Sequence, residues 1–155
     1  MTNEKEAVSA TANRGLTITR LINAPRELMW EVWTNPEHIK NWWGPDGFTN
    51  TIFKMDVKNG GVWDFIMHGP DGTDYKNKNV FAEIVKPEKI VYDHVSDPRH
   101  HTTITFEERG NKTLLTMTMI FETAESKEQC VKTYKADIGL TQNINKLEEY
   151  LTKVS

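Results

Sequence analysis

Apolar and polar side chains alternate along much of the chain, which is the pattern of β-strands with one buried face. The first alternating run, residues 16–22, places Leu16 and Ile18 on one side of a strand and Thr17 and Thr19 on the other. Six further runs of β type follow, separated by turn-forming Gly, Pro, Asn and Asp residues. They span residues 48–57, 62–68, 79–85, 89–96, 102–108 and 113–121. Their short, regular spacing predicts an antiparallel meander.

Two other segments have helical patterns. After the first strand, Pro25 suits the first turn of a short helix. Asn35 and Pro36 end that helix and begin a second one, because Asn caps a helix N-terminus and Pro fits its first position. The last segment, residues 125–154, contains no proline and is predicted to form one long helix, whose apolar stripe moves to another face at Gly139.

This order of elements predicts an α+β fold. A sheet of about seven strands must bury one face, and the final helix is its only large apolar partner. We therefore expect a curved antiparallel sheet wrapped around a long C-terminal helix, with two short helices between the first two strands. Residues 1–15 lack an apolar pattern and are predicted to form a flexible N-terminal tail, which leaves residues 16–155 as a single domain.

Composition and charge narrow the range of partners. The chain of 155 residues has a formal net charge of −3 and no cluster of Lys or Arg, which argues against nucleic-acid binding. It contains no apolar run long enough for membrane insertion. Cys130 is the only cysteine, so no intramolecular disulfide can form, and a reducing, cytoplasmic location is expected.

Several short motifs together resemble one protein family. They are Asn35-Pro36-Glu37, Trp42-Trp43-Gly44-Pro45, Gly47-Phe48-Thr49, Pro70-Asp71-Gly72 and Leu147-Glu148-Glu149-Tyr150-Leu151. The chain resembles the heat-shock protein 90 ATPase activator homologue family of the START-like (SRPBCC) superfamily. The resemblance implies a helix-grip fold, related to that of the birch-pollen allergen, with an apolar cavity between sheet and helix. It implies no single activity, because lipid carriers, polyketide cyclases and chaperone-associated domains share the superfamily.

Strand alternation and this resemblance together predict the cavity wall. Trp63, Phe65 and Met67 share one strand face, and so do Met117 and Met119, which suits either a plain packed core or a pocket for an apolar ligand. The resemblance favours the pocket. The predicted lining is Trp33, Trp42, Trp43, Phe48, Trp63, Phe65, Met67, Phe81, Tyr92, His94, Ile104, Phe106, Met117, Met119, Tyr134 and Ile138.

Two acid–base side chains are weak catalytic candidates. Alternation puts Phe81 and Glu83 on one side of a strand, so if Phe81 faces inward then Glu83 would lie near His94 in the pocket. In the alternative, Glu83 points to solvent.

The remaining reactive side chains predict neither a metal site nor a reactive thiol. His94, His100, His101 and Asp97 lie near one turn, but their spacing fits no recognised zinc site, so neither a metal nor another cofactor is predicted. Cys130 is expected to be a small buried hydrophobic residue.

Three functions are compatible with the sequence. The first is a carrier or sensor of a small hydrophobic molecule such as a lipid, in a stress-related context. The second is an enzyme of the cyclase or hydrolase type acting on an apolar substrate. The third is a co-chaperone-like interaction module, although the residues before Leu16 are too few for the separate chaperone-binding domain of the family's activator. A monomer or weak homodimer is expected.

Overall fold

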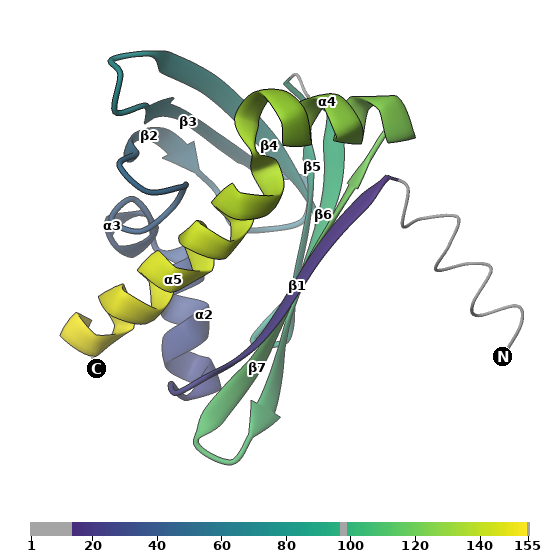
Figure 1. Cartoon of the computed structure of the whole chain (residues 1–155). Helices are drawn as coiled ribbons and strands as arrows, with labels where there is room; N and C mark the ends of the chain where they lie inside the picture. Colours follow the sequence, from purple (N-terminus) through teal and green to yellow (C-terminus); the bar gives the residue numbers. More distant parts are fainter. Residues whose placement is uncertain (1–13, 97–98, 155) are drawn as a thin grey trace, which may run out of the picture.

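One curved antiparallel sheet organises the protein. The computed structural model describes residues 14–96 and 99–154, and their seven strands pair in the order β1-β7-β6-β5-β4-β3-β2 (Figure 1). The strands are β1 (Gly15–Ile22), β2 (Thr49–Met55), β3 (Val62–His68), β4 (Asp74–Val85), β5 (Lys89–His94), β6 (His100–Arg109) and β7 (Lys112–Phe121). The predicted meander from β2 to β7 is confirmed, and β1 joins it beside β7. Most of the predicted tail lies outside the described residues.

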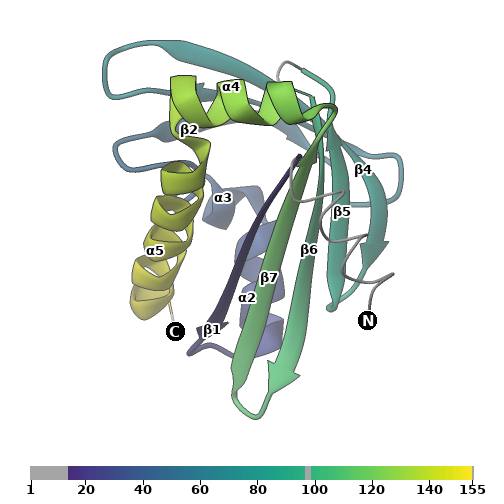
Figure 2. The same cartoon turned by 45° about the vertical axis from the view of Figure 1, so that its right-hand side comes forward.

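Four helices complete the described part of the chain. They are α2 (Arg26–Thr34), α3 (Pro36–Ile39), α4 (Ala124–Tyr134) and α5 (Ala136–Val154). As predicted, Asn35 caps α3, because its side-chain oxygen accepts a hydrogen bond of 3.0 Å from the Glu37 backbone N–H. Helices α2 and α5 lie on the same side of the sheet, and α4 runs from the end of β7 across to α5 (Figures 1 and 2). None of the described helices is both long and apolar enough to cross a membrane.

The C-terminal segment is bent, so the prediction of one continuous helix was wrong. Lys135 adopts a left-handed conformation, with φ of 52° and ψ of 49°, and separates α4 from α5. Glycine or asparagine usually occupies such a position, so a lysine there is not recognisable as a break. The predicted shift of the apolar stripe at Gly139 reflects this bend, which lies four residues earlier, at Lys135.

Aromatic side chains pack one end of the interior solid. Trp33 of α2 contacts Trp42, Trp43 and Phe106, with ring centroids 4.8, 5.8 and 5.7 Å apart. The buried apolar side chains of α5 complete this core from the other side. They are Leu140, Ile144, Leu147 and Leu151.

The turn between β2 and β3 has no room for a side chain at Gly61. A Cβ atom added there would lie 1.9 Å from the carbonyl oxygen of Asp56. Gly61 is held in place by two hydrogen bonds, from its N–H to Lys58 O at 2.8 Å and from Phe81 N–H to its own carbonyl at 2.9 Å. The turn is thereby fixed against β4.

We expect Gly61→Ala to lower the free energy of unfolding by more than about 2 kcal/mol, because the backbone must shift to relieve the clash. The control is Gly60→Ala. Gly60 has a φ of 82° but open space around its Cα, so that change should cost only about 1 kcal/mol. Urea unfolding followed by tryptophan fluorescence measures both. Equal losses for the two variants would contradict the steric argument.

Candidate ligand-binding cavity

A cavity of about 810 Å³ lies between the inner face of the sheet and the helices α4 and α5. Its apolar wall comes from β3, β7 and the helices. These residues are Phe65, Met67, Met117, Met119, Phe121, Cys130 and Leu140. The cavity begins where the aromatic core ends, so one end of the interior is filled by side chains and the other is hollow.

The structure divides the predicted lining residues between the cavity and the core. Those that line the cavity are Trp43, Phe48, Phe65, Met67, Tyr92, His94, Met117, Met119, Tyr134 and Ile138. Those that lie in the packed core instead are Trp33, Trp42, Trp63, Phe81, Ile104 and Phe106. Strand periodicity identifies the inner face of a strand. It does not say which side chains on that face pack against other side chains and which line a cavity. Trp63, for example, stacks on Phe65 and Phe81 and separates core from cavity.

A row of polar side chains crosses the cavity wall on three neighbouring strands. Asn79, His94 and His100 lie directly opposite one another in β4, β5 and β6. His94 Nδ1 donates to Asn79 Oδ1 at 2.7 Å, and the rings of His94 and His100 stack with centroids 4.6 Å apart. The Nδ1 atom of His100 shares a hydrogen bond of 2.9 Å with the Thr102 hydroxyl. Asn79 was not predicted as a lining residue, because strand register cannot be derived from the sequence of one strand.

Three titratable side chains of the inner wall, His100, Tyr92 and Cys130, are uncharged near neutral pH. Burial, together with the neighbouring His94 and His101, lowers the pKa of His100 to about 3. Burial also raises the pKa of Tyr92 and that of the Cys130 thiol, so neither ionises. The charged side chains that touch the cavity are all exposed. They are Asp46, Asp71, Asp74, Lys76 and Lys135.

Aromatic rings mark the mouth of the cavity. Tyr75 of β4 contacts Phe48 on one side and Tyr134 of α4 on the other, with centroid distances of 5.9 and 6.3 Å. Tyr134 and Ile138 are 58% and 52% exposed. A ligand would therefore pass apolar side chains before it reaches the interior.

Hydrogen bonds fix the loop before β2 to α5, and this loop forms one wall of the cavity. The Asn143 side chain accepts from the Gly44 backbone N–H at 3.0 Å. Lys146 Nζ donates to the carbonyl oxygens of Pro45 and Phe48 at 3.1 and 3.3 Å. A Cβ on Gly139 would lie 3.3 Å from Pro45 Cγ, so the absence of a side chain lets the helix and the loop approach closely.

The family model described as activator of Hsp90 ATPase homolog 1-like protein matches residues 23–152. The chain belongs to this family. The resemblance of the sequence motifs is thereby confirmed.

Solved structures share the complete fold. A crystal structure of a protein from Nitrosomonas europaea is 21% identical with a TM-score of 0.83, and the match covers 92% of this chain and 96% of that one. A solution structure of a protein from Arthrobacter aurescens is 24% identical with a TM-score of 0.84 over 92% and 88% of the two chains. A crystal structure of a Mycobacterium smegmatis protein is 23% identical with a TM-score of 0.82 over 94% and 95%. The predicted helix-grip fold is confirmed. No curated protein matches the chain.

Within this family fold, the predicted acid–base pair does not come together. The register of β4 shifts between Phe81 and Glu83, so the two side chains do not share a face as simple alternation predicts. Phe81 is buried, whereas Glu83 is exposed and forms an ion pair of 2.9 Å with Lys89. His94 lies in the cavity wall, whereas the Glu83 carboxylate points to solvent and pairs with Lys89.

The histidines near the turn after β5 have separate surroundings. His101 is exposed and bonds to Asp93 at 2.7 Å, while His94 and His100 face the cavity. Asp97 lies outside the described residues. Among the residues that are described, no group of three or more His, Cys, Asp or Glu could hold a metal ion.

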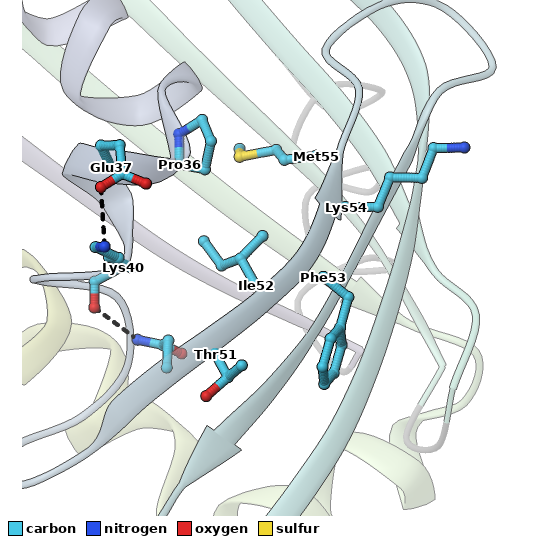
Figure 3. A pocket seen from close by; sticks show the side chains of 9 residues that line it. Pro36, Glu37, Lys40, Thr51, Ile52, Phe53, Lys54 and Met55 are labelled. Carbon is cyan, nitrogen blue, oxygen red and sulfur yellow. Dashed lines mark hydrogen bonds and ion pairs between the residues drawn. The ribbon is translucent and has the colours of Figure 1, made fainter.

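A second hollow, of about 370 Å³, lies between α3 and the edge strand β2 (Figure 3). Ile52 and Met55 extend toward Pro36, whereas Phe53 points away. Exposed Glu37 and Lys40, an ion pair of 2.9 Å, border the hollow. The lining of this hollow is mostly polar, whereas that of the larger cavity is mostly apolar, so the cavity is the better site for an apolar ligand.

We expect the stability of the protein to fall between pH 6.5 and pH 5 because of His100. In the unfolded chain the imidazole has its ordinary pKa near 6.5, whereas its folded pKa is about 3. Between these pH values the unfolded state binds more protons than the folded state. The free energy of unfolding therefore falls by at most about 1.4 kcal/mol for each pH unit of acidification. His100→Gln should reduce this loss by about 1–2 kcal/mol over the interval, measured by urea unfolding at pH 6.5 and at pH 5.

The control is His101→Gln, at an exposed position, which should retain most of the loss of stability between the two pH values. The same loss in wild type and His100→Gln would show that His100 is not buried in its neutral form.

Proposed function

We propose that the protein binds a small apolar molecule in the cavity between the sheet and the helices α4 and α5, as a carrier or sensor. One observation carries this proposal. The hollow of about 810 Å³ has the size of a small-molecule site and an apolar wall with a few polar groups.

The composition of the wall supports a ligand of variable shape. Met67, Met117 and Met119 contribute flexible, polarisable side chains that adjust to different surfaces. Filling the hollow would restore the contacts that packed interiors normally have, which favours binding.

The comparisons support the fold on which this proposal depends, and the names of the solved relatives state no ligand. The enzymatic and co-chaperone alternatives, and the cytoplasmic location, stay predictions of the sequence.

We expect the neutral dye N-phenyl-1-naphthylamine to bind saturably, with a rise in dye fluorescence as it leaves water. Met119→Trp should weaken binding at least about tenfold, because the larger side chain occupies the hollow. The matched control is Thr118→Trp. Thr118 precedes Met119 in β7 and points to the other face, where it bonds to Thr17.

Urea unfolding of each variant separates loss of the site from loss of the fold. Unchanged dye affinity in a folded Met119→Trp variant would place the dye elsewhere. The lack of any saturable binding, by this dye and by the biphenyl probes described below, would contradict the proposed function.

A further inference from the structure

The polar row in the cavity wall constrains the chemistry of the ligand. Buried polar groups in proteins almost always have hydrogen-bond partners. Both ring nitrogens of His94 have one, since Nδ1 bonds to Asn79 and Ser96 Oγ lies 3.1 Å from Nε2. His100 differs. Its Nδ1 bonds to Thr102, and within the part of the chain that the structure describes its Nε2 has no hydrogen-bond partner.

The Thr102 hydroxyl lets His100 act either as donor or as acceptor toward a ligand. A hydroxyl can donate one hydrogen bond and accept others. If Thr102 accepts from Nδ1, then Nε2 of the neutral ring is an acceptor. If Thr102 donates to Nδ1, then Nε2 carries the proton and is a donor. The buried Tyr92 lies directly opposite Thr102 in the neighbouring strand β5. Only a ligand group that both donates and accepts suits both states, and a hydroxyl is the simplest such group.

Among the described residues that line the cavity, a carboxylate on the ligand would find no lysine or arginine at this depth. The Asp and Lys side chains that touch the cavity are exposed, and the groups beside His100 are Tyr92, His94 and Phe121. Burying a carboxylate without a compensating cation costs several kcal/mol. The lowered pKa of His100 agrees with this, because the imidazole does not become the missing cation near neutral pH.

We propose that the ligand is an uncharged alcohol or phenol whose hydroxyl group hydrogen-bonds to Nε2 of His100 and whose apolar body packs against Met117, Met119 and Phe121. This inference rests on the proposed function and adds to it the class of the ligand. It distinguishes alcohols and phenols from fatty acids and from plain hydrocarbons.

Three probes with one apolar body test the inference at pH 7. They are 4-hydroxybiphenyl, biphenyl and biphenyl-4-carboxylate. We expect wild-type protein to bind the phenol at least about tenfold more tightly than the carboxylate. The preference for the phenol over biphenyl should fall about five- to tenfold in His100→Phe, which keeps a ring but loses the hydrogen bond. In the control His101→Phe, on the opposite face of β6, the preference should stay as in wild type.

Spectroscopy provides a readout that needs no variant. In ¹⁵N-labelled wild-type protein, 4-hydroxybiphenyl should shift the Nε2 resonance of His100, and biphenyl should shift it much less. The inference is overturned if the carboxylate binds as tightly as the phenol, or if the phenol preference is the same in wild type and His100→Phe. In both cases saturable binding of biphenyl would leave the proposed function standing. If none of the three probes binds saturably, the proposed function fails with the inference.

Discussion

The bend at Lys135 decides which part of the interior is filled. Helix α5 buries four large apolar side chains against the aromatic core, whereas Cys130 is the one buried residue of α4 among those described. The inner face of the sheet opposite α4 is nevertheless apolar, with Phe65, Met117 and Phe121 among its side chains. An apolar face without an apolar partner leaves a hollow, and the cavity lies there. A straight helix would present its side chains to a different part of the sheet.

The polar row that crosses this hollow is costly to bury, and hydrogen bonding offsets the cost. Asn79, His94 and Thr102 are buried, and each has a hydrogen-bond partner. Asn79 and His94 form one cross-strand ladder with His100, because antiparallel pairing places these three residues opposite one another. The ladder supplies the cavity with directional contacts, and its His100 carries no charge near neutral pH. A carboxylate would therefore be a poor occupant, and the apolar walls alone would not orient a ligand.

The irregularity in β4 has a consequence for chemistry. Without the register shift after Phe81, Glu83 would follow the buried phenylalanine onto the inner face and bring a carboxylate near His94. The bulge instead directs Glu83 to solvent, where Lys89 pairs with it. A single extra residue in one strand thus separates the two groups that alternation places together.

Most of the architecture could be predicted from the sequence, because it depends on local patterns. Alternation identifies the strands, Asn35 and Pro36 mark the start of α3, and the family motifs identify the helix-grip fold. The tertiary structure decided the rest, since volume and register are properties of elements brought together. It placed Trp63 and Phe81 in the core but Met117 beside the cavity, aligned Asn79 with His94 and His100, and bent the last helix at a lysine. None of these outcomes depends on the residue alone; each depends on which neighbour occupies the opposite position.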